Sequence, residues 1–63
     1  MSVEAEWLVE KFGEAKTARI LKECHEDPDM IDHHAICEFE PYDKKRQDFR
    51  CCVRSVLKDL YGD

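Results

Sequence analysis

The chain has 63 residues, of which 40% are charged, and a formal net charge of −5. A chain of this length forms at most one domain, and it buries only about 60% of the surface that its unfolded form exposes. So small a core leaves little room for a substrate pocket with a set of catalytic groups. We therefore expect one domain over residues 1–63 with no enzymatic activity and no cofactor.

The acidic surplus lies in the first half of the chain. Residues 1–32 hold nine acids against four bases, whereas residues 33–63 hold six of each. Nonspecific DNA binding needs a cationic surface, so nucleic acid is a disfavoured partner and a protein with a basic surface is favoured. No run of about 20 apolar residues is present and no signal peptide is recognisable, so we expect a cytoplasmic protein without membrane contact.

The first helical segment is expected to begin at Ser2 as N-cap and to continue to about Cys24. Its apolar residues change faces close to Gly13, a residue that is unfavourable inside a helix. Either the helix breaks at Gly13, or one long helix is buried on two sides, which would require a second copy of the chain. The two faces consist of Ala5, Leu8, Phe12 and Ala15, and of Thr17, Ile20, Leu21 and Cys24.

Two breaks follow, at Pro28 and at residues 39–41, because proline removes a backbone donor and disfavours helix before it. Between them we expect a short helix through Cys37, capped by Asp29 or Asp32, with Met30, Ile31 and Ile36 as core contacts. The last helix is expected from Pro41 to Tyr61, ending at Gly62. Its apolar stripe at helical spacing consists of Phe49, Val53, Val56, Leu57 and Leu60.

These segments predict an all-α fold of three or four short helices, arranged as a helical hairpin or small bundle in a single helical domain over residues 1–63. Trp7 and Val9 project from further sides of the first helix and add to its apolar surface. Because one small chain has little to cover that surface with, we expect a homodimer to complete the fold.

A partner-binding surface is predicted on the first helix, with Trp7 and Val9 as apolar contacts. Beside them an acidic ridge would face a basic partner, although such a ridge is also typical of a solvated helix face. The ridge consists of Glu6, Glu10 and Glu14.

A basic ridge runs along the last helix at intervals of four residues. Like charges at this spacing destabilise an isolated helix, so acids of the same chain, of a second subunit or of an anionic partner should offset them. The ridge consists of Arg46, Arg50, Arg54 and Lys58.

A zinc site is a further hypothesis, because two cysteines and two histidines would provide tetrahedral ligands. The spacing lacks a Cys-x2-Cys pair, and the alternative is core cysteines with solvent-exposed histidines. The candidate ligands are Cys24, His33, His34 and Cys37. Of the adjacent Cys51 and Cys52, the first is expected to face solvent and the second to border the apolar stripe.

Two stretches resemble known families. Residues 11–21, KFGEAKTARIL, resemble the first helices of Cro-type phage repressors, whose pattern is F-G-x-x-K-T-A-x-x-L, and this implies a helix-turn-helix that breaks at the glycine. Where that family continues into a polar recognition helix, this chain has Pro28 among four acids, which would repel DNA. The region from Phe39 to Leu57 is similar to the C-terminal helix of small phage and prophage proteins.

From these features we expect a non-enzymatic protein-binding module, a small phage-type inhibitor or regulator of a host protein. A DNA-binding regulator of the helix-turn-helix class and a zinc-stabilised interaction module are the alternatives.

Overall fold

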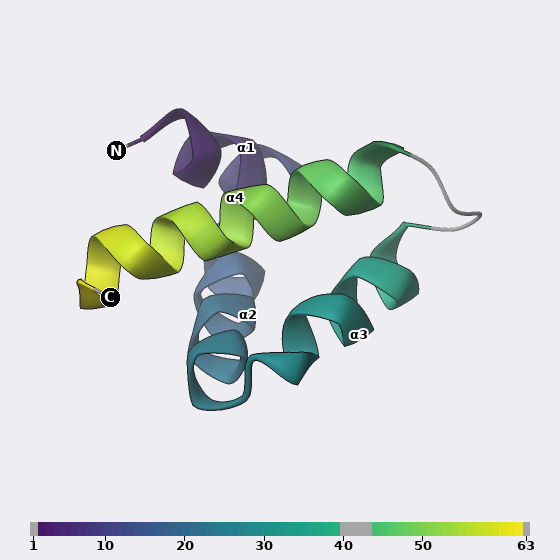
Figure 1. The fold of residues 1–63 in the computed structure, drawn as a ribbon. Helices are drawn as coiled ribbons and strands as arrows, with labels where there is room; N and C mark the ends of the chain where they lie inside the picture. The colour runs from purple at the N-terminus through teal and green to yellow at the C-terminus, as the bar shows by residue number, and fades with distance from the viewer. Residues whose placement is uncertain (1, 40–43, 63) are drawn as a thin grey trace.

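The chain forms four α-helices joined by short connections in the computed structural model, which describes residues 2–39 and 44–62 (Figure 1). The all-α prediction is confirmed, and no strand occurs within the described ranges. The start of the last helix predicted at Pro41 lies outside them. The helices are α1 (Val3–Phe12), α2 (Glu14–Glu26), α3 (Asp29–Glu38) and α4 (Lys44–Tyr61).

The helix breaks at Gly13, so the alternative of one long leading helix is wrong. Gly13 has φ +82° and ψ 163°, a backbone conformation that only glycine adopts readily, and its N–H donates to the carbonyl of Val9 at 2.7 Å. The change of direction brings both apolar faces to a single core. Leu8 and Ile20 are accordingly only 1% and 2% exposed.

The helix termini agree with the predicted caps except at α3. The Ser2 Oγ accepts a hydrogen bond from the backbone N–H of Ala5 at 3.2 Å, which confirms the first cap. At α3 the predicted caps Asp29 and Asp32 are wrong, because both lie inside the helix. Asp27 has extended backbone geometry instead, and its carboxylate accepts the N–H of Asp29 at 3.1 Å.

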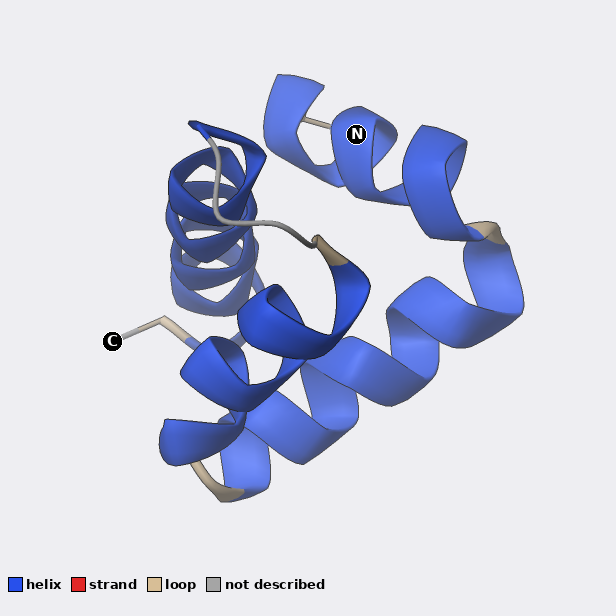
Figure 2. Ribbon diagram, turned by 90° about the vertical axis from the view of Figure 1, so that its right-hand side faces the viewer, coloured by secondary structure: helices blue, strands red, loops and turns tan. Residues whose placement is uncertain are grey.

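Helix α4 crosses the other helices and closes the core (Figures 1 and 2). Phe49, Val53 and Val56 of the predicted stripe are buried, whereas Leu60 is 61% exposed. Leu60 is therefore not a core residue, although the same turn of α4 contacts α2 through Tyr61, whose ring stacks on His25 with 3.5 Å between centroids. Gly62 ends the helix as predicted, with φ +75° and its N–H donating to the Lys58 carbonyl at 2.8 Å.

Four aromatic rings from α1, the end of α3 and α4 pack against one another. Phe39 lies at the centre of this cluster, with ring centroids 6.1 Å from Trp7, 5.8 Å from Phe12 and 5.7 Å from Phe49. Phe12 also contacts Phe49 edge to face at 5.8 Å, an arrangement that aromatic pairs prefer. Phe39 thus contributes to the core, although it stands just beyond α3. The prediction of Ile36 as a core contact is wrong, because its side chain is 48% exposed.

The leading helices carry less uncovered apolar surface than the sequence predicts. Leu8 and Ile20 are buried, and Trp7 and Leu21 are half-buried against the core. The chain therefore covers most of the apolar surface of these two helices by itself, although Val3 remains 75% exposed. A homodimer stays a prediction, but excess apolar surface on these helices is no longer a reason for it.

Candidate functional site

Two grooves flank the buried stripe of α4, one on each side, and each has a volume of about 300 Å³. At 100° per residue, Asp48, Cys51 and Cys52 lie on one flank of the stripe. Arg54, Leu57 and Lys58 lie on the other flank. The first flank faces α1 and the second faces α2 and α3, so the two grooves are separate sites.

The α1–α4 groove has an apolar floor built by two residues one helical turn apart. Val3 and Trp7 lie on the same side of α1, and Val3 is 75% exposed. The indole of Trp7 packs against Phe39 on its inner side, and the Lys11 ammonium lies 5.8 Å from the ring centroid. Trp7 is therefore held in place while one part of it stays accessible. The groove is lined by Val3, Glu4, Trp7, Asp48, Cys51 and Cys52.

Two carboxylates make the α1–α4 groove electronegative. Burial raises the pKa of the Cys52 thiol above its ordinary value, and Glu4 and Asp48 raise it further because their negative charges lie nearby. Neither carboxylate forms an ion pair within the part of the chain that the structure describes. An apolar group with a cation beside it would fit this combination of an apolar floor and two carboxylates.

The predicted partner-binding residues divide between this groove and its surroundings. Trp7 lines the groove, whereas Val9 is half-buried outside it. Glu6, Glu10 and Glu14 are all exposed, but Glu14 begins α2 beyond the break at Gly13, so the predicted ridge is not continuous; Glu6 and Glu10 lie on the α1 surface that continues from Trp7 away from α4.

Of the six residues that line this groove, only Trp7 was predicted from the sequence to bind a partner; the other five, Val3, Glu4, Asp48, Cys51 and Cys52, were not. The spacing of Val3, Glu4 and Trp7 on α1 was a usable signal, because residues three and four apart are neighbours on a helix. The place of Asp48 depends on α1 packing against α4, which no local pattern shows.

The first half of the basic ridge of α4 contacts other parts of the chain. The Arg46 Nε donates to the Phe39 carbonyl at 2.6 Å, and the Arg50 Nε lies 2.7 Å from the Asp32 carboxylate. The Arg50–Asp32 ion pair agrees with neutralisation within the chain. Arg54 and Lys58 are exposed, form no ion pair with any described residue and line the second groove instead.

The four candidate zinc ligands do not form a metal centre. Cys24 is only 1% exposed and lies in the hydrophobic core, where burial raises the pKa of its thiol to about 11, with smaller contributions from Glu23 and Asp27. The His34 Nε2 is engaged with Glu23 at 2.8 Å, and only His33 and Cys37 meet, with 3.6 Å between Nε2 and Sγ. No group of three His, Cys, Asp or Glu side chains suited to a metal ion occurs in residues 2–39 and 44–62.

Comparison with known proteins identifies no relative. No protein-family model matches the chain, and no curated protein or solved structure is detectably similar to it. Within the described residues, no helix is both long and apolar enough to cross a membrane.

Proposed function

We propose that this chain is a non-enzymatic protein-binding module that receives an apolar, basic segment of a partner protein in the α1–α4 groove. In line with its resemblance to small phage and prophage proteins, it would act in the cytoplasm as an inhibitor or regulator of a host protein. One observation carries the proposal: the apolar floor of Val3 and Trp7 lies in the same groove as two carboxylates, Glu4 and Asp48, that have no ion-pair partner in the described structure.

The physical reason is that aromatic and charged residues contribute differently to protein interfaces. A half-buried aromatic residue at the centre contributes most of the binding free energy, and charges at the rim select and orient the partner. Trp7 is the aromatic residue that lines this groove, and Glu4 and Asp48 are its charged lining residues. The exposed Glu6 and Glu10 extend the negative surface away from α4, so that a partner segment rich in lysine or arginine would approach it favourably.

Trp7 provides a direct test, because it is the only tryptophan of the chain and lines the groove. The probe is a synthetic amphipathic peptide of leucine and lysine, with a leucine–glutamate peptide of the same pattern as control. We expect the leucine–lysine peptide to shift the Trp7 emission to shorter wavelength in a saturable manner, and added salt to weaken its binding. Equal binding of both peptides would contradict the proposal.

Variants then locate the binding site. Glu4→Gln combined with Asp48→Asn should weaken binding of the leucine–lysine peptide about three- to tenfold, since each exposed charge pair contributes up to about 1 kcal/mol. Glu26→Gln combined with Asp29→Asn is the matched control, because both residues are exposed where α2 ends and α3 begins, and neither lines the groove. If the control weakened binding as much as the variant of Glu4 and Asp48, the effect would be one of net charge. A host protein retained by the wild type but not by the variant of Glu4 and Asp48 would then identify the partner.

The DNA-binding alternative has one point in its favour, the break at Gly13 where the Cro-type resemblance places it. However, α3, which would occupy the place of a recognition helix, contains no lysine or arginine and exposes Asp29 and Asp32. Carboxylates there would meet phosphates unfavourably. A gel shift with phage operator DNA over a range of salt concentrations distinguishes the two functions, and tight sequence-dependent binding would favour the regulator.

A further inference from the structure

We propose that the second groove, between α4 and the α2–α3 corner, is a binding site for a small aliphatic carboxylate. The proposal is independent of the α1–α4 groove, because the two sites share no lining residue and carry opposite charge. We call the second site the α2–α4 groove.

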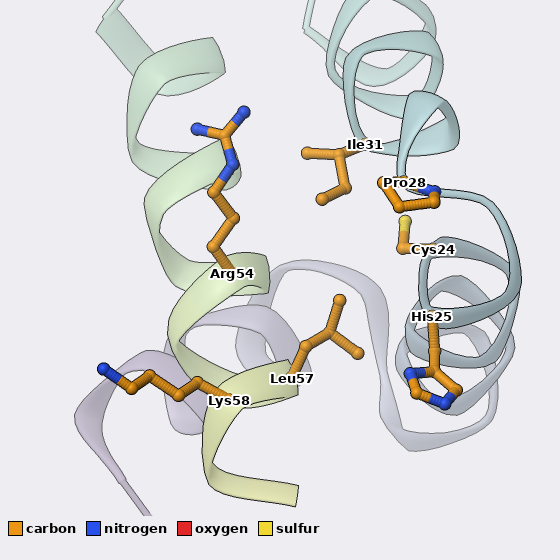
Figure 3. Close-up of a pocket in the computed structure, with 7 residues that line it drawn as sticks. All are labelled: Cys24, His25, Pro28, Ile31, Arg54, Leu57 and Lys58. Atoms are coloured by element: carbon orange, nitrogen blue, oxygen red, sulfur yellow. The ribbon is translucent and has the colours of Figure 1, made fainter. Parts of the chain in front are cut away.

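The α2–α4 groove has an apolar interior contributed by three helices and the turn between two of them. Leu57 projects from α4 toward Cys24 on α2 and Ile31 on α3, and Pro28 completes this wall at the corner (Figure 3). The His25 ring stacks on Tyr61 with 3.5 Å between centroids and 8° between planes, which holds the end of α4 against the end of α2 beside the groove. An aliphatic chain would therefore meet a preformed apolar surface.

The two charged residues that line the groove, Arg54 and Lys58, are both cations. Both line it from α4, and no aspartate or glutamate is among its lining residues. In Figure 3 the Arg54 guanidinium lies at the level of Ile31, on the α4 side of the apolar wall, while the Lys58 side chain extends outward. Neither cation has an ion-pair partner among the described residues. A carboxylate next to Arg54 would form the charge-assisted hydrogen bonds that this guanidinium lacks there.

The size of the groove indicates a small molecule. Its α4 side extends over about one turn, from Arg54 to Lys58, and its volume of about 300 Å³ lies at the lower end of the range for small-molecule pockets. A short aliphatic chain with one carboxylate combines an apolar body with one anionic end, which matches one apolar wall and one pair of cations.

The test is a titration of the ¹⁵N-labelled chain with octanoate, followed by amide chemical shifts. We expect saturable shifts confined to the groove, around Cys24, Ile31, Arg54 and Leu57. Three control ligands separate the two parts of octanoate. Octan-1-ol keeps the alkyl chain but has no charge, octylammonium carries the opposite charge, and acetate has the carboxylate without the long alkyl chain. Each should bind at least about three times more weakly than octanoate. An acidic peptide ending in leucine is included as a macromolecular competitor.

Variants test the role of the two cations. Arg54→Gln with Lys58→Gln should weaken octanoate binding about three- to tenfold and leave the helical circular dichroism unchanged, because both side chains are exposed. Arg19→Gln, an exposed arginine of α2 outside the groove, should leave binding unchanged. The proposal is overturned by equal binding of octan-1-ol, by shifts centred on Trp7, by an unaffected double variant, or by the peptide binding where octanoate does not. None of these outcomes depends on the α1–α4 groove, which the Trp7 emission reports separately.

Discussion

Thr17 and Cys24 are neighbouring parts of the α2 face that enters the core, and both carry polar atoms. The Thr17 hydroxyl donates to the Leu8 carbonyl at 3.1 Å, across the break at Gly13. No buried side-chain nitrogen or oxygen is left without a partner in the described ranges. The sequence placed Thr17 on an apolar face with Ile20 but could not identify its acceptor, because the acceptor reaches Thr17 only through the turn.

Cys24 links the protonation of one thiol to the stability of the fold. Desolvation by burial, then the charges of Glu23 and Asp27, raise its pKa from 9.0 to about 11. The folded chain therefore holds the thiol proton more tightly than the unfolded chain does. The stabilisation that this provides is complete below about pH 9 and is lost as the pH rises toward 11.

We therefore expect the free energy of unfolding of the wild type to fall between pH 9 and 11 by up to about 2–3 kcal/mol more than that of Cys24→Ala. Urea denaturation at a series of pH values measures the difference, and it cancels the titration of lysines and tyrosines that both proteins share. Parallel pH profiles for the two proteins would show that the Cys24 thiol titrates normally.

Gly13 and Gly62 both end helices with positive φ, yet they occupy different structural settings. Gly13 lies between two helices that meet in the core, whereas Gly62 stands after the exposed last turn of α4. Nothing lies within 4 Å of a Cβ added at either position, so a substitution would act through backbone conformation and not through steric overlap.

Gly13→Ala should consequently destabilise the fold by about 1–3 kcal/mol, because alanine at φ +82° and ψ 163° is strained. Gly62→Ala is the matched control and should cost less, since the end of α4 can fray without opening the core. Urea denaturation of both variants provides the comparison. A Gly13→Ala variant as stable as the wild type would indicate that α1 and α2 can join in one helix.

The sequence predicted correctly the helix ends that depend on only a few neighbouring residues. The Ser2 cap, the extended geometry of Asp27 before Pro28 and the stop at Gly62 all follow from local backbone chemistry. The exposure of Ile36 and Leu60 was wrongly predicted, because it depends on which side of each helix its neighbours cover. Periodicity identifies an apolar face of a helix but does not say how much of that face a partner helix covers.

At the scale of the whole molecule, neither groove could be predicted from the sequence. The α1–α4 groove combines Trp7 with Asp48, and the α2–α4 groove combines Cys24 with Leu57. Each pair is far apart in the chain and meets only through the packing of α4 against the other helices. The residue types were visible in the sequence, and Trp7 was singled out, but their arrangement is a property of the tertiary fold.

The closed core leads to a prediction about assembly. Because Leu8, Ile20 and Phe49 are buried within one chain, we expect the Tm to be independent of protein concentration over a hundredfold range. Differential scanning calorimetry measures this, and sedimentation equilibrium gives the mass at the same concentrations. A Tm that rises with concentration, together with a dimer mass, would show that a second copy contributes to folding, as the sequence predicted.

The close packing of α1 against α4 also has a consequence for synthesis on the ribosome. Helices α1 to α3 emerge first, and until α4 has joined them the chain lacks Phe49 and Val53, which fill the centre of the core. The nascent polypeptide thus exposes Leu8 and Trp7 until α4 has left the exit tunnel, and only then does the domain close cooperatively. Emergence of α4 from the tunnel, and not of the first three helices, therefore sets the moment at which this domain becomes resistant to proteases.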